Sequence, residues 1–209
     1  MAPHAERIGG LQGFKIMDSR GNYTVMAEVT AGNVISQGFS PSGASKGSDE
    51  AKELPSEEAI SNMPEIKKAI SHIDIFNQAE IDQAMIDLDG TKDLSRLGAN
   101  AILAVSLAVV HAAAKLRGEP LFQYVGKLIS NKKPNLLPVP MMNVINGGVH
   151  AENGMAFQEF MIVPIGGSSI TEAIDIGRNN YFRLGKIIGA SGVGDEGGYS
   201  PSFSTSDPE

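Results

Sequence analysis

The sequence contains no cysteine among its 209 residues. Neither a disulfide bond nor a thiolate metal site can therefore form. This absence is consistent with a reducing compartment, where disulfide bonds are rare. The first ten residues, MAPHAERIGG, also lack an apolar core of the length found in a signal peptide.

The chain also lacks a basic surface and a long uncharged apolar run. Its formal net charge is −7, which argues against a nucleic-acid partner. An anionic substrate would need local positive charge, most simply from bound metal ions. The most apolar segment, residues 99–114, is interrupted by Asn100, Ser106 and His111, and this predicts a buried helix. We therefore expect a cytoplasmic protein that does not bind a membrane.

Alternating apolar residues predict a three-stranded meander at the start of the chain. The expected strands cover residues 14–16, 23–30 and 33–39, with a turn at residues 19–22. The segment PSGASKGSDE at residues 41–50 is too rich in glycine, serine and proline for regular structure. Two interpretations stay open for it, namely a mobile linker and a lid that closes over a ligand.

Helical spacing of apolar residues follows from residue 49 to residue 128. We expect helices at residues 49–54, 65–70, 79–88, 97–116 and 121–128. The polar segment NKKPN at residues 131–135 then predicts a domain boundary. Because this first part combines strands with a block of helices, we expect an α+β domain over residues 8–134.

The second part of the chain contains titratable residues in loops that could bind or catalyse. Two apolar runs at residues 139–145 and 157–163 predict strands joined by a loop with two glycines and His150. A helix is expected over residues 169–188, followed by the glycine-rich loop GVGDEGGYSPSF with Asp195 and Glu196. Taken alone, His150 could lie exposed on a surface hairpin, and the two acidic residues could form a solvated turn.

Four blocks together resemble the enolase family and span nearly the whole chain in the family's order. These blocks are KIMDSRGNYTVMAEV, SGASKG, LGANAILAVSLAVVHAAAKL, and PVPMMNVINGGVHAENGMAFQEFM with GVGDEGG. The resemblance implies an α+β N-terminal domain with a three-stranded meander plus helices over residues 8–134. Residues 135–209 would begin an α/β, TIM-like barrel that is truncated, since a complete barrel takes about 250 residues.

The resemblance also implies a reaction, the reversible dehydration of 2-phosphoglycerate to phosphoenolpyruvate in glycolysis. In this reading Glu196 is the general acid and Glu159 is the carboxylate beside it, which also binds substrate. His150 resembles a substrate-binding residue, and Ser45 resembles a ligand of the second of two Mg²⁺ ions. Arg20 resembles part of a turn that makes subunit or domain contacts near the site.

Some of the family's functional residues have no counterpart in this sequence. No residue matches the lysine base or the three carboxylates that hold the first magnesium ion. Tyr23 and Lys46 also replace residues usual in the family. We expect the chain to be inactive alone, with a homo-oligomer or a complementary barrel chain as its partner. Three alternatives stay open, namely a part of an enolase, one half of a split enzyme, and a non-catalytic binding module.

Overall fold

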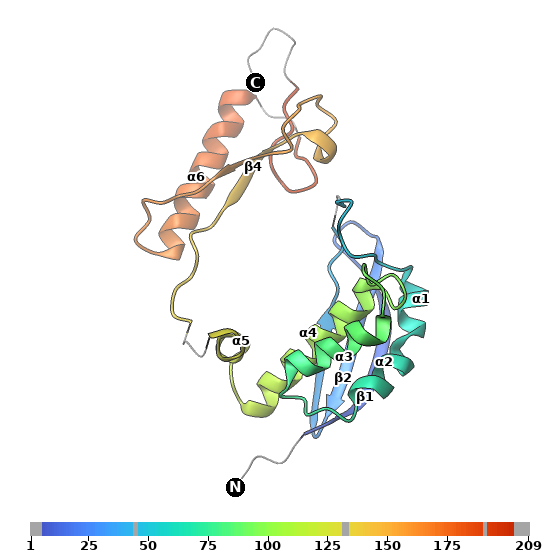
Figure 1. Ribbon diagram of the computed structural model, residues 1–209. Helices are drawn as coiled ribbons and strands as arrows, with labels where there is room; N and C mark the ends of the chain where they lie inside the picture. The colour runs from blue at the N-terminus through green and yellow to red at the C-terminus, as the bar shows by residue number, and fades with distance from the viewer. Residues whose placement is uncertain (1–5, 44–45, 131–133, 190–191, 203–209) are drawn as a thin grey trace. The chain divides into compact units, whose positions relative to one another are not determined.

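The computed structural model describes residues 6–43, 46–130, 134–189 and 192–202 (Figure 1). The chain forms two compact units, Met1–Pro134 and Asn135–Glu209, each with its own packing. The last four residues, SDPE, have the pattern of a capping box that opens a helix, and they lie outside the described residues.

The first unit contains the predicted three-stranded antiparallel meander. Its strands β1 (Ile8–Met17), β2 (Tyr23–Ala31) and β3 (Val34–Phe39) lie in the order β1-β2-β3. In β2, every second residue from Val25 to Ala31 is fully buried, while the residues between them are more exposed. This alternation turns one face of the sheet toward the helices, as period-two side-chain placement requires (Figure 1).

Strand β1 is longer than the predicted segment of residues 14–16. It pairs with β2 from Ile8 opposite Ala31 to Met17 opposite Tyr23, with one irregularity near Gly10. The sequence predicted too short a strand here because it contains three glycines, Gly9, Gly10 and Gly13, and glycine is depleted in strands. Pairing with a well-defined neighbour overrides that weak local preference.

Within its described residues the first unit also contains five helices. Helices α1 (Ser56–Ser61) and α2 (Met63–Ile70) pack against β1, whereas α4 (Ala99–Arg117) packs against β2 and β3. Helix α3 (Gln78–Asp89) contacts α2 and α4, and α5 (Leu121–Ser130) contacts α4. By length and hydropathy alone α4 could cross a membrane, but here it supplies much of the buried core.

The helix expected at residues 49–54 is absent, and that prediction was wrong. The amide of Lys52 donates to the Asp93 carbonyl at 2.7 Å, and the Ala99 amide donates to the Lys52 carbonyl at 2.8 Å. The side chain of Asn100 binds both backbone groups of Leu54. This backbone is therefore bonded to distant segments, and Pro55 further disfavours a helical conformation at residue 54.

Helix α4 approaches β3 so closely that a side chain at Gly38 would not fit. A Cβ atom there would overlap the carbonyl oxygen of Ala104 and the amide nitrogen of Ala108, and would lie 2.9 Å from the Leu107 carbonyl carbon. All three are backbone atoms of one helix, so none can move without shifting α4.

We expect Gly38→Ala to lower the free energy of unfolding by about 1–3 kcal/mol, as overpacking typically does. Urea unfolding followed by circular dichroism measures this change. Gly9→Ala is the matched control, because its Cβ would meet only the Thr30 carbonyl at 3.7 Å. Equal stability of the two variants would contradict the close packing described here.

Asp89, at the end of α3, organises the loop that leads into α4. Its carboxylate is buried and accepts from the amides of Thr91, Arg96 and Leu97 at 3.0, 3.1 and 2.7 Å, and from the Thr91 hydroxyl. Burial by itself raises the pKa of Asp89, but these hydrogen bonds outweigh it and the pKa lies below its usual value.

Because the folded pKa is lowered, ionised Asp89 stabilises the fold above the unfolded pKa of about 3.9. This contribution is lost as the pH falls through the folded pKa. Asp89→Asn should therefore lower the free energy of unfolding by about 1.5–3 kcal/mol at neutral pH. The difference in unfolding free energy between this variant and the unchanged protein should become smaller as the pH is lowered.

Urea unfolding across this pH range tests the prediction, with exposed Asp87→Asn as the control. If Asp89→Asn and Asp87→Asn lowered the free energy of unfolding equally, the stabilising role of ionised Asp89 would be contradicted.

The second unit begins with two antiparallel strands, β4 (Met142–Asn146) and β5 (Glu159–Ile162), joined through the short 3-10 helix η1 (Gly148–His150). Helix α6 (Ile170–Ile188) follows, and its start is capped by the Ser169 hydroxyl accepting from the Glu172 amide. The chain then returns so that Tyr199 bridges Ile145 in parallel. This strand–helix–parallel return is the partial barrel that the sequence predicted.

Candidate active site

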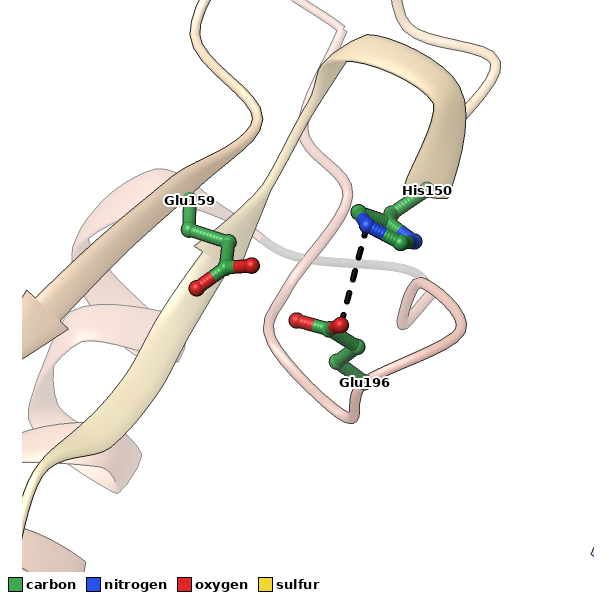
Figure 2. A group of neighbouring side chains, drawn as sticks. All are labelled: His150, Glu159 and Glu196. Atoms are coloured by element: carbon green, nitrogen blue, oxygen red, sulfur yellow. Dashed lines mark ion pairs between the residues drawn. The ribbon is translucent and has the colours of Figure 1, made fainter. Parts of the chain in front are cut away.

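Three of the predicted site residues converge in the second unit. His150 ends η1, Glu159 begins β5, and Glu196 lies in the loop after α6 (Figure 2). One ligand atom from each side chain lies within 4.8 Å of the others. Such a group could hold a metal ion.

His150 is buried, with 3% of its surface exposed, so the alternative of an exposed hairpin histidine is wrong. Its Nε2 atom lies 2.5 Å from the Gln158 side-chain nitrogen and 3.6 Å from Glu196 Oε1. Nε2 is therefore the ring nitrogen that faces both of these side chains.

The loop before His150 depends on the glycine pair of residues 147–148. A Cβ at Gly147 would overlap the Phe157 carbonyl oxygen, and Gly148 has a φ of +54°. The Gly147 amide donates to Gln158 and the Gly148 amide donates to Met155. These bonds fold the loop back on β5 and so bring His150 beside Glu159.

Glu196 occupies a tight turn made by residues 194–198. The Gly194 amide donates to the Gly198 carbonyl at 2.8 Å, and the Gly197 amide donates to the Gly194 carbonyl at 3.0 Å. The Asp195 amide donates to the His150 carbonyl at 3.1 Å, which joins this turn to η1. The turn therefore fixes Glu196 next to the histidine.

Asn143 and Asn146 of β4 hold this arrangement, and neither was expected from the sequence. Asn143 Nδ2 donates to Glu196 Oε2 at 3.0 Å. Asn146 is fully buried, and its Oδ1 accepts from the Gly198 amide at 2.8 Å. The only signal for them was a pair of polar residues inside an otherwise apolar strand.

Two stacked tyrosines also contact this turn of residues 194–198. The Tyr181 hydroxyl, on α6, donates to the Gly197 carbonyl at 2.9 Å. The Tyr181 and Tyr199 rings stack with centroids 4.2 Å apart. Burial, with the neighbouring Tyr199 phenol, raises the pKa of Tyr181, so this hydroxyl remains a donor well above neutral pH.

The other two predicted residues belong to the first unit. Arg20 lies in the β1–β2 turn, where its guanidinium donates to the Ser42 carbonyl at 2.7 Å and thereby tethers the start of the glycine-rich segment. Ser45 lies outside the described residues. Of the two unusual residues, Lys46 pairs with Glu53 at 2.6 Å and Tyr23 lies under the Lys15 ammonium.

Comparison with known families agrees with this architecture. Residues 8–125 match the enolase N-terminal domain, and residues 134–208 match the enolase C-terminal TIM barrel domain. The chain belongs to the enolase family. The enolase of Metamycoplasma arthritidis (strain 158L3-1) is 44% identical over 219 residues, which cover 95% of this chain and 48% of that relative. The chain thus spans about half the length of this curated enolase.

Membership of the enolase family confirms the resemblance carried by the four sequence blocks. The last of those blocks, which covers residues 138–161 and 192–198, contains all three converging side chains. The sequence therefore located these residues, whereas their mutual distances come from the folded second unit.

We expect Asn146→Ala to release the turn of residues 194–198, because the Gly198 amide loses its buried acceptor. The free energy needed to open this turn should fall by about 1–3 kcal/mol. Hydrogen exchange measured by mass spectrometry should then show faster exchange in residues 192–200. Asn180→Ala is the control, since Asn180 is exposed and its side chain donates to the Ile176 carbonyl of the same helix. Unchanged exchange in Asn146→Ala would contradict this role.

Proposed function

We propose that this chain contributes part of an active site for the reversible dehydration of 2-phosphoglycerate to phosphoenolpyruvate. The single observation that carries the proposal is the convergence of Glu196, His150 and Glu159 on one side of the second unit. An elimination of this kind needs a general acid, because hydroxide is a poor leaving group. Carboxyl groups close together can retain the proton that such an acid must give.

In this proposal Glu196 protonates the departing hydroxyl group. Its side chain is about one-third exposed, so it can reach a substrate, while Asn143 restrains one of its oxygen atoms. A ligand atom of Glu159 lies within 4.8 Å of one on Glu196, so that the two charges repel each other and favour retention of a proton, and Glu159 also contacts the substrate. Buried His150 offers a ring nitrogen to bind the substrate.

The roles of Ser45 and Arg20 are also proposals. Ser45 would be a magnesium ligand, and Arg20 would make a subunit or domain contact near the site. Magnesium ions, when bound, stabilise negative charge that develops on the substrate carboxylate. The imidazole of the converging group suits magnesium poorly, because Mg²⁺ prefers oxygen ligands. The part of the reaction assigned to the converging group is therefore proton transfer and substrate binding.

We further propose that the chain acts in the cytoplasm, either as a homo-oligomer or with a complementary chain that supplies the remaining barrel strands. Large apolar side chains on and around β4 and β5 support this proposal. Met141, Phe157, Phe160, Met161 and Val163 are between 37% and 65% exposed. An apolar surface of this kind favours association. We therefore expect no dehydration by the 209-residue chain alone.

The test mixes this chain with the C-terminal half of the Metamycoplasma arthritidis enolase and follows phosphoenolpyruvate absorbance with magnesium present. We expect turnover only in the mixture. Glu196→Gln should reduce it about 10²–10⁴-fold, because it removes the proton donor. Glu152→Gln is the matched control, since Glu152 is exposed and lies outside the converging group.

Two results would overturn parts of this proposal. Turnover by the chain alone, if abolished by Glu196→Gln, would refute the need for a partner. Full activity of Glu196→Gln in the mixture would refute its role as the acid. A mixture that binds tightly but does not turn over would favour the non-catalytic binding module.

A further inference from the structure

We propose that Asn153 is a deamidation site in the folded chain, and that its conversion to aspartate or isoaspartate releases the loop that carries His150. The only co-reactant is water, and no enzyme is needed. The modification does not depend on the proposed dehydration.

The chain contains two Asn–Gly dipeptides, Asn146–Gly147 and Asn153–Gly154. An asparagine followed by glycine is open to this reaction, because the backbone nitrogen of the next residue attacks the side-chain carbonyl carbon. Glycine has no Cβ atom to obstruct that approach, and it adopts backbone angles closed to other residues. The same local chemistry thus occurs twice, and the surroundings in the fold decide which pair reacts.

The reaction at Asn153 conserves atoms and needs no redox partner. The Gly154 nitrogen loses its proton and bonds to Cγ of Asn153. The Cγ–Nδ2 bond then breaks, and Nδ2 takes up a proton and leaves as ammonia. Water opens the resulting succinimide ring at either of its carbonyl carbons. One opening gives aspartate, and the other gives isoaspartate, in which the main chain runs through the former side chain.

The surroundings of Asn153 permit these steps. Gly154 is exposed and has a φ of +76°, and a Cβ atom there would have no neighbour within 4 Å. Its amide donates to no backbone carbonyl of the described residues, so its nitrogen can lose a proton to solvent. The Met155 amide donates to Asn153 Oδ1 at 3.2 Å, and this bond stabilises the negative charge that develops on that oxygen during attack.

The fold shields the other pair. Asn146 is fully buried, and Gly147 is also buried, so water does not reach them. The Gly147 amide donates to the Gln158 carbonyl at 2.9 Å, so the attacking nitrogen is already bonded. The space beside Gly147 is filled, since a Cβ atom there would overlap the Phe157 carbonyl oxygen. Asn146 can therefore react only after this part of the chain opens.

Conversion of Asn153 removes a hydrogen bond that holds the loop of residues 147–158. Asn153 Nδ2 donates to the Asn146 carbonyl at 2.8 Å. An ionised aspartate cannot donate, and its oxygen would face this carbonyl oxygen and repel it. Isoaspartate also lengthens the main chain between Gly148 and Met155, which are joined by a hydrogen bond of 3.0 Å. His150 lies within this loop, so its position depends on an unmodified Asn153.

The first test incubates the untagged 209-residue chain at mildly alkaline pH and follows both dipeptides by peptide mapping with mass spectrometry. We expect Asn153 to deamidate about tenfold faster than Asn146 or more, because Asn146 reacts only in opened molecules. The same incubation in urea is the control, and there the two rates should be similar.

Two results of this test would overturn the proposal. The first is equal rates at Asn153 and Asn146 in the folded chain, or no reaction at Asn153 there. The second is a rate ratio that urea leaves unchanged, because the local sequence and not the fold would then set the two rates.

The second test replaces Asn153 by its product. In Asn153→Asp we expect hydrogen exchange in residues 147–158 to become about tenfold faster, because a hydrogen bond within the loop is lost. Asn179→Asp is the matched control, since it adds the same charge at an exposed position of α6. Unchanged exchange in Asn153→Asp would overturn the link between this residue and the loop. If Asn153→Asp does not fold, exchange in the aged chain, whose modified fraction the mapping gives, decides the same point.

Discussion

The hydrogen bond from the Gly198 amide to buried Asn146 Oδ1 is the contact on which the candidate site depends. It holds a turn that follows α6 against a strand that precedes it by about fifty residues of chain. A Cβ at Gly198 would lie 2.8 Å from this oxygen and 2.9 Å from the Ile145 amide nitrogen. Only glycine permits this approach, and the approach places Glu196 beside His150.

Close backbone contact also controls the first unit. Gly38 lets α4 lie directly on β3, and small residues along α4 allow the helix to pack deeply against the sheet. In both units, therefore, a glycine removes a side chain at the point where a helix or turn must meet a strand. Such contacts are sensitive to a single methyl group, because protein interiors leave little free volume.

The converging group combines a buried imidazole with two more accessible carboxylates. Burial holds the His150 ring in place, whereas Glu196 lies in an exposed turn and accepts a hydrogen bond from Asn143. The proposed proton transfer depends on this pairing of a fixed ring with a more accessible carboxylate.

The sequence by itself determined the meander, the helices α3, α4 and α6, the two short strands of the second unit and the family. Periodic burial and the motifs around His150, Glu159 and Glu196 carry this information locally. Tertiary structure alone decided that β1 extends to Ile8 and that residues 49–54 are not helical, because their hydrogen bonds go to distant segments. It also decided the parts played by Asn143, Asn146 and Gln158. Their partners lie elsewhere in the chain, so no local pattern could reveal them.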